Sequence, residues 1–129
     1  MTTAAPSLFK TTPKDHLGFG LYKDRPNYSD VVHFLEFEKR DVSQATGVPI
    51  HSVRYDDKIK SELADRIKEW AILLNLVAEF FQGDGRKTAL WFSVSNPLLG
   101  NIKPRDMIRF GRFKKLYTFI WNALEENKR

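Results

Sequence analysis

Cysteine is absent from the 129 residues, and the sequence has no long uninterrupted hydrophobic run. Without cysteine the chain cannot form disulfides, thiolate zinc sites or iron–sulfur clusters, and it cannot use a cysteine nucleophile. The most apolar stretch, residues 71–81, is short and contains Asn75 and Glu79, so we expect no membrane-spanning helix. Residues 1–10 lack a basic segment leading into an apolar run, so we expect no signal peptide and a cytoplasmic protein.

The composition is that of a folded protein with an uneven charge. With 42% hydrophobic and 13% aromatic residues, the chain can bury a core as one domain or as two small domains that share it. Residues 100–129 hold eight basic and three acidic side chains, which accounts for the whole net charge of +5. Such a basic segment favours an anionic partner, either nucleic acid or the acidic face of a protein, although a solvated helix face explains it equally well.

Hydrophobic periodicity predicts an all-α protein. Residues 1–27 are rich in proline and glycine and lack periodicity, so we expect an irregular N-terminal arm. Apolar residues then recur every three or four positions, most clearly over residues 57–82 and from residue 113 onward. Shorter helices are expected at 30–38, 39–46, 49–53, 86–93 and 104–110. The sequence therefore predicts a compact bundle of about six to seven helices.

Residues 41–54 have the spacing of a helix-turn-helix. This motif needs a small residue where two short helices approach, a turn glycine, and apolar residues that lock the second helix onto the first. Ser43 and Gly47 meet the first two requirements, and Val48 and Val53 meet the third. A plain helical hairpin with no DNA contact remains the alternative interpretation.

In a helix-turn-helix, the N-terminal residues of the second helix contact base edges in the major groove. That placement predicts the following DNA-binding residues, with the first near a phosphate: Gln44, His51, Ser52, Arg54 and Tyr55. Because one such unit contacts little DNA, we also expect a homodimer that binds a palindromic site. Asp56 and Asp57 bring negative charge close to this surface and weaken the case for tight binding by a monomer.

A second motif occupies residues 91–108. It consists of a tryptophan, Asn-Pro, a leucine pair, a glycine, and a proline followed two residues later by an aspartate: Trp91, Asn96, Pro97, Leu98, Leu99, Gly100, Pro104 and Asp106. The side chain of Asn96 can brace the turn, and Gly100 allows a backbone conformation that larger residues resist. We expect Pro97, Leu98, Leu99, Gly100 and Pro104 to build the fold rather than to contact a partner.

This second motif resembles the C-terminal toxin-binding domain of the Xre/MbcA/ParS-type antitoxins. The helix-turn-helix pattern and the long helix that follows it match the N-terminal half of the same family, so the resemblance covers about residues 28–125. It implies three segments: the arm at 1–27, an Xre-like half at 28–82, and a toxin-binding half at 83–129.

The resemblance implies an antitoxin encoded beside its toxin, commonly a RES-domain enzyme that attacks NAD. The C-terminal half would block the active site of the toxin, and the helix-turn-helix would bind the promoter of the operon. The implied partner-binding residues combine a large apolar anchor with the basic side chains that follow it: Trp91, Arg105, Arg109, Arg112, Lys114, Lys115, Lys128 and Arg129. Residues 109–115 are more basic and aromatic than is usual in the family, so they could contact nucleic acid instead.

Two other function classes are a stand-alone regulator and an enzyme. A stand-alone helix-turn-helix regulator without a toxin explains the first motif but not the second. An enzyme is not expected, because His16, His33 and His51 are far apart and no two have the spacing of metal ligands on one helix face. No Ser–His–Asp arrangement stands out, and we expect neither a cofactor nor a metal.

Overall fold

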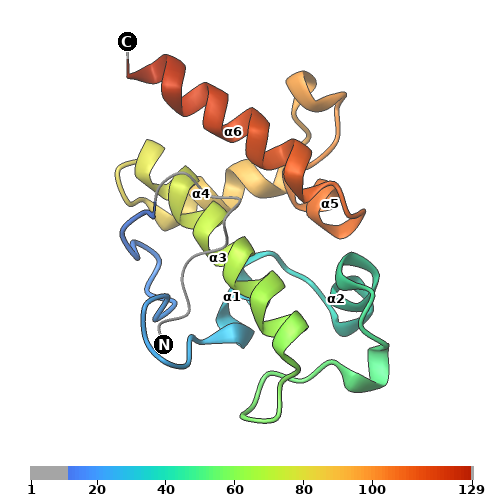
Figure 1. The fold of residues 1–129 in the computed structure, drawn as a ribbon. Coiled ribbons are helices and arrows are strands. Elements are labelled where there is room, and N and C mark those ends of the chain that lie inside the picture. The colour runs from blue at the N-terminus through green and yellow to red at the C-terminus, as the bar shows by residue number, and fades with distance from the viewer. Residues whose placement is uncertain (1–11, 129) are drawn as a thin grey trace.

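The computed structural model describes residues 12–128, so predictions for residues 1–11 and for Arg129 lie outside the described part. Within residues 12–128 the protein is all-α, as predicted, and has six α-helices (Figure 1). They are α1 (Tyr28–Phe34), α2 (Lys39–Thr46), α3 (Ser61–Phe80), α4 (Gly85–Ser93), α5 (Pro104–Arg109) and α6 (Phe113–Asn127). Two short 3-10 helices, η1 (Ile50–Ser52) and η2 (Pro97–Leu99), complete the fold. None of the described helices combines the length and the apolar character that crossing a bilayer requires.

Helix α3 is the axis around which the other elements pack (Figure 1). Every residue from 70 to 78 is buried, so this part of the helix is covered on all sides. Helix α3 contacts α1 at one end and α4 and α6 at the other. Buried residues of both predicted halves, such as Leu35 and Ile108, belong to one hydrophobic cluster. The two halves therefore share a core.

Residues 12–27 contain no helix or strand, which agrees with the prediction of an irregular arm. They are nevertheless part of the core, since Phe19 and Leu21 are buried. The carboxylate of Asp15 accepts hydrogen bonds from three successive backbone N–H groups, those of residues 19, 20 and 21, at 3.0, 2.8 and 3.2 Å. The buried Asn75 of α3 accepts a 3.0 Å bond from the backbone N–H of Leu17. A polar residue in the middle of α3 thus holds this segment against the core.

Helix α2 has the boundaries that the sequence predicts. A capping box joins Glu38 and Asp41 at its start, and Gly47 ends it in the left-handed conformation, with φ +78°. The side chain of Ser43 donates a 2.7 Å hydrogen bond to the carbonyl of Val48 and fixes the turn that follows. These interactions are local in sequence, which is why the sequence alone identified the helix.

We expect Gly47→Ala to lower the free energy of unfolding by about 1 kcal/mol, because an L-residue resists the left-handed conformation. A Cβ at residue 47 would meet no atom within 4 Å, so the cost is conformational rather than steric. Urea unfolding followed by circular dichroism measures the change. The matched control is Gly85→Ala in the first turn of α4, where alanine should be neutral or slightly stabilising. Equal effects of the two substitutions would contradict this account.

The prediction of an α-helix over residues 49–53 is wrong. The structure has only the three-residue 3-10 turn η1 there, and α3 begins at Ser61 rather than near Asp57. The carboxylate of Asp56 explains the later start of α3, because it accepts the backbone N–H of Lys58 at 3.1 Å and binds the guanidinium of Arg54. A short side chain that bonds nearby backbone in this way competes with helix formation. The second helix of the predicted helix-turn-helix is therefore a single turn.

Candidate functional site

The segment between α4 and α5 is a closed loop whose tip is Leu98. The side chain of Asn96 accepts a 2.9 Å hydrogen bond from the backbone N–H of Leu98, as its predicted bracing role requires. The backbone N–H of Asn96 donates to the carbonyl of Ile102 at 3.1 Å, and Gly100 has φ +74°. Leu98 is 79% exposed. Leu98 is therefore not a core residue, because the turn directs this side chain outward. That it builds the fold without contacting a partner stays a prediction.

An apolar cleft lies between this loop, the end of α3 and helix α6. Its volume is about 170 Å³. The residues that line it include Val77, Phe80, Trp91, Leu98, Phe119 and Leu124. Phe80 is 49% exposed, although it has a large aromatic side chain. Three segments that are distant in the sequence thus meet at one apolar opening.

A larger depression, the basic basin, adjoins the cleft on the other side of Leu98. Its volume is about 740 Å³. The residues that line it include Leu98, Ile102, Arg112, Lys114, Lys115 and Phe119. Leu98 and Phe119 line both the basin and the cleft, so the two hollows share a wall. The basin combines an apolar floor with three basic side chains.

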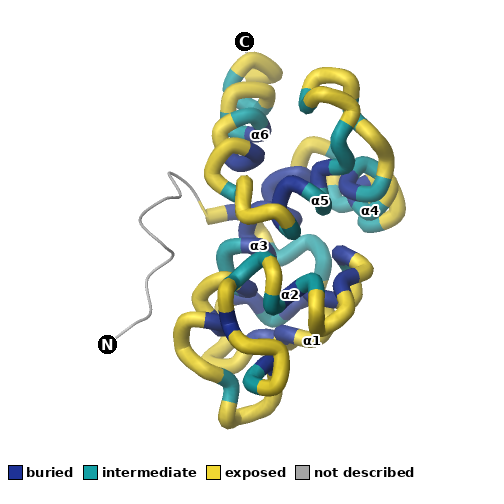
Figure 2. The backbone as a smooth tube through the Cα atoms, turned by 90° about the vertical axis from the view of Figure 1, so that its right-hand side faces the viewer, coloured by how far each residue is buried: buried dark blue, intermediate teal, exposed yellow. Residues whose placement is uncertain are grey.

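A third depression of about 420 Å³ extends the surface along α4, where Leu90 is 62% exposed. It shares Trp91 and Asn96 with the apolar cleft. We call the three depressions together the α4–α6 groove. In Figure 2, α6 lies on one side of this part of the molecule and the mainly exposed segment after α4 lies on the other. No aspartate or glutamate is among the described residues that line it, so its polar rim is basic.

The predicted partner-binding residues fall into two groups. Trp91, Arg112, Lys114 and Lys115 line the groove. The others that the structure describes are engaged within the chain: Arg105 pairs with Glu36, Arg109 with Asp106 at 3.0 Å, and Lys128 with Glu125 at 3.2 Å. The structure thus brings four of the predicted residues to one surface.

Arg105 joins two parts of the molecule. It lies in the first turn of α5, and its partner Glu36 lies in the connection between α1 and α2. Helices α2 and α5 are also in contact. Arg105 therefore links the connection between α1 and α2 to the segment of residues 91–108.

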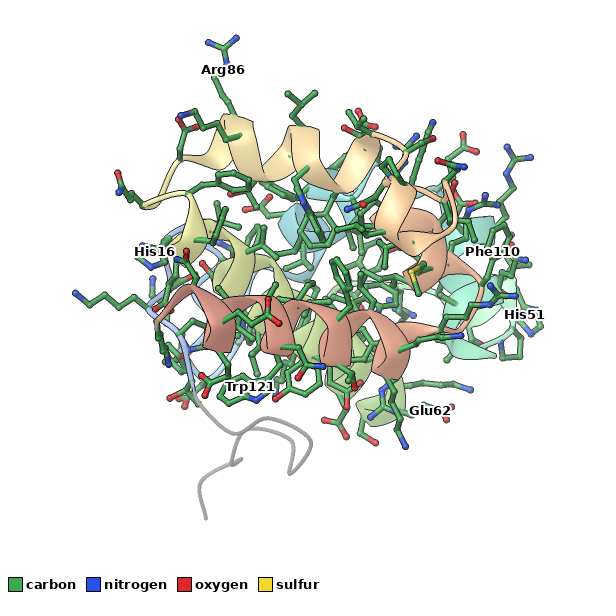
Figure 3. All side chains as sticks on the ribbon, turned by 90° about the horizontal axis from the view of Figure 1, so that it is seen from above. His16, His51, Glu62, Arg86, Phe110 and Trp121 are labelled. Atoms are coloured by element: carbon green, nitrogen blue, oxygen red, sulfur yellow. The ribbon has the colours of Figure 1, made fainter. Side chains whose placement is uncertain are left out.

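Among the predicted DNA-binding residues, Gln44 lies on α2, His51 and Ser52 lie on η1, and Arg54 and Tyr55 follow it. Gln44 and His51 are exposed, whereas Ser52 and Tyr55 are half-buried. The hydroxyl of Tyr55 is buried, and burial raises the pKa of this side chain. Figure 3 shows His51 at the same end of the molecule as Phe110 of the α5–α6 junction, far from His16. Because η1 is one turn long, these residues do not form an α-helical face that could fill a major groove.

Arg54 is the arginine of the predicted DNA-binding set, and it forms an ion pair with Asp56. Its Nε and Nη2 atoms donate to the two carboxylate oxygens at 2.7 and 2.5 Å. This bidentate hydrogen bonding lowers the pKa of Asp56 from its ordinary 3.8 to about 2. Any phosphate that binds Arg54 must compete with this carboxylate.

The pair predicts a pH dependence of stability. The pKa of Asp56 is lower in the folded state, so its stabilising effect is present above 3.8 and is lost as the pH falls toward 2. We expect the free energy of unfolding of the native protein to fall over this interval more steeply than that of Asp56→Asn. Urea titrations at several pH values measure both slopes, and Asp57→Asn is the control at the neighbouring residue. Equal slopes for the native protein and Asp56→Asn would exclude a role for the pair.

Sequence reasoning missed Phe80, Leu98 and Phe119 as surface residues. Phe80 lies off the apolar stripe of the long helix, which runs through Leu74, Val77 and Phe81. A large aromatic residue off the buried stripe is a usable signal of an exposed apolar site. Phe119 carries the same signal, because it lies off the buried stripe of α6, which runs through Leu116, Tyr117 and Ile120. Leu98 carries no comparable signal, since it belongs to a motif that is expected to build the fold.

Comparison of the chain with protein-family models and with curated proteins gave no match. The groove, the basic rim and the two sequence motifs are therefore the features from which a function can be proposed.

Proposed function

We propose that this protein is a non-catalytic antitoxin that binds a cognate toxin through the α4–α6 groove and inhibits it by direct contact. The observation that carries the proposal is the exposure of large apolar side chains around one groove with a polar rim. Monomeric proteins rarely expose such contiguous apolar surfaces, and those that do commonly bind another protein there. Trp91, at the wall between two of the depressions, is the type of residue that dominates binding energy at interfaces.

The sequence supports the same function. The motif of residues 91–108, which resembles the toxin-binding domain of the Xre/MbcA/ParS-type antitoxins, contains the loop on one side of the groove and two of its lining residues, Trp91 and Leu98. By that resemblance the partner is a RES-type toxin that attacks NAD. The basic residues Arg112, Lys114 and Lys115 on the groove are then the ones that face it.

Binding of the chain to its own promoter, as a homodimer, completes the proposal. It is supported by the net charge of +5 and by the exposed side chains of Gln44 and His51 beside the turn. A stand-alone DNA-binding regulator is the alternative function. It needs the same promoter binding but gives the groove no protein partner.

Co-expression with the product of the adjacent gene tests the antitoxin function. We expect the two proteins to co-elute in size-exclusion chromatography, and we expect this chain to restore growth that the partner alone arrests. A neighbouring product that is harmless and forms no complex would overturn the proposal.

Promoter binding is measured separately by fluorescence anisotropy at several salt concentrations. Electrostatic contact with phosphates makes affinity fall as salt rises, and His51→Ala should weaken binding if η1 contacts DNA. Promoter binding without any toxic neighbour would favour the stand-alone regulator. Absence of duplex binding would overturn the promoter-binding part of the proposal. It would not affect toxin binding, which the co-expression experiment tests.

A further inference from the structure

We propose that the α4–α6 groove receives an acidic amphipathic segment of the protein partner, with an apolar side chain in the cleft and carboxylates over the basic basin. The inference rests on the proposed function and specifies the chemistry of what the groove binds. It also states which protein supplies the inserted segment: a segment of the partner binds in the groove of this protein.

The apolar cleft has the size of an anchor site. At about 170 Å³ it is smaller than the roughly 300–1,000 Å³ of pockets that hold whole small molecules. Its walls are apolar apart from Asn96, whose side-chain oxygen is already bonded to the backbone of the loop. One large apolar side chain that enters between Phe80, Leu98 and Phe119 would be removed from water on all sides.

The basic basin supplies the charge that selects the segment. Among the described residues, none forms an ion pair with Arg112, Lys114 or Lys115, and all three are exposed. Lys114 acts on the carboxylate of Glu69 in α3. Burial raises the pKa of Glu69, while Arg66, at 2.9 Å, and Lys114 act to lower it. Because few acidic residues of the chain neutralise these three cations, a ligand that covers them is favoured when it carries carboxylates.

The shared wall requires one ligand for both hollows. Because Leu98 and Phe119 line the cleft and the basin alike, a segment that fills the cleft also passes over the cations. On a helix, an apolar residue and carboxylates three or four positions away lie on adjacent parts of the surface. The complementary segment is therefore a helix with a leucine-rich face flanked by aspartate or glutamate.

The same charges disfavour a second copy of this chain. In a two-fold symmetric dimer through the groove, each patch would face an identical patch. Arg112, Lys114 and Lys115 of both protomers would then lie in one interface, without an acidic residue of the described groove lining to offset their charge. A nucleic acid would satisfy the cations but not the apolar cleft or the exposed Leu90.

Peptide binding to the full chain tests the inference. The probes are three fluorescein-labelled peptides of about 15 residues with leucines at helical spacing and with glutamate, glutamine or lysine at all flanking positions. By anisotropy we expect the glutamate peptide to bind at least about tenfold more tightly than the glutamine peptide, and the lysine peptide not to bind. The affinity for the glutamate peptide should fall as salt is added.

Two variants assign this binding to the groove. Leu98→Asp and the double substitution Lys114→Glu/Lys115→Glu should each lower the affinity for the glutamate peptide by about tenfold or more. The control Lys39→Glu/Lys60→Glu changes the net charge equally at two exposed lysines outside the groove lining and should have no effect. Circular dichroism confirms that each variant is folded.

Several results would overturn the inference: no binding of the glutamate peptide, equal binding of the glutamate and glutamine peptides, or an equal loss in the control. Self-association that Leu98→Asp abolishes would assign the groove to a second copy, and tighter binding of single-stranded DNA would assign it to nucleic acid. The antitoxin function fails separately. If the chain binds the glutamate peptide but the adjacent gene encodes no toxin, the binding site is supported and the antitoxin function is overturned. If a toxin complex forms but neither variant weakens it, the antitoxin function is supported and the binding site is overturned.

Discussion

Replacement of Asp15 by alanine is expected to lower the free energy of unfolding by about 3 kcal/mol. The substitution removes the acceptor of three backbone N–H groups, those of Phe19, Gly20 and Leu21. Phe19 and Leu21 are buried, so their N–H groups cannot all turn to water without opening the segment. Charged acceptors contribute more than neutral ones, and an orphaned buried donor adds its own cost. Urea unfolding followed by circular dichroism gives the change.

Asp24→Ala is the matched control for this prediction. Asp24 is exposed, and no described residue forms a hydrogen bond or ion pair with its side chain. The control removes the same charge from the same segment, so it should leave the free energy of unfolding within about 0.5 kcal/mol of the native value. If both variants were equally stable, residues 12–27 would have no structural dependence on the Asp15 carboxylate.

Replacement of Leu98 by aspartate is expected to weaken the complex with the proposed protein partner by about a hundredfold, which corresponds to about 2.7 kcal/mol. Leu98 lies on the wall shared by the apolar cleft and the basic basin. The substitution removes an apolar contact at the centre of the groove and introduces a carboxylate that competes for the basic side chains. Because Leu98 is so exposed, stability should change by less than about 0.5 kcal/mol. Titration calorimetry with the purified partner measures the affinity.

Ile50→Asp is the matched control for Leu98→Asp. Ile50 is also an exposed apolar residue, 51% accessible, but it lies on η1 and not in the groove. We expect this variant to bind the partner with unchanged affinity. A loss of affinity as large as that of Leu98→Asp would show that exposed apolar surface in general, and not the groove, governs the complex.

The helices could be predicted because their signals are local. The capping box at Asp41 and the left-handed Gly47 define α2 within a few residues of the chain, and Pro104 marks the start of α5 in the same way. The predicted start of the long helix near Asp57 is wrong, because a hydrogen bond between the Asp56 side chain and nearby backbone competes with helix formation there. Asp56 binds Arg54 and the backbone of Lys58, and α3 begins at Ser61 rather than near Asp57.

The candidate site could be predicted only in part. The sequence identified Trp91, Arg112, Lys114 and Lys115, because a tryptophan and a run of cations are visible as composition. It could not separate these cations from Arg105, which is paired with Glu36 across 69 positions of the chain. Whether a basic side chain is available to a partner depends on which distant carboxylate lies beside it.

The sequence by itself determined the all-α class, the positions of most helices, the braced turn at Asn96 and the location of the excess charge. Each of these follows from interactions within about four residues or from composition. The tertiary structure alone decided that Phe80, Leu98 and Phe119 meet at one opening, and that Asp15 and Asn75 hold the N-terminal segment on α3. Exposure and proximity between distant segments arise from packing, and the periodicity of a single helix does not specify which of its apolar residues remain uncovered.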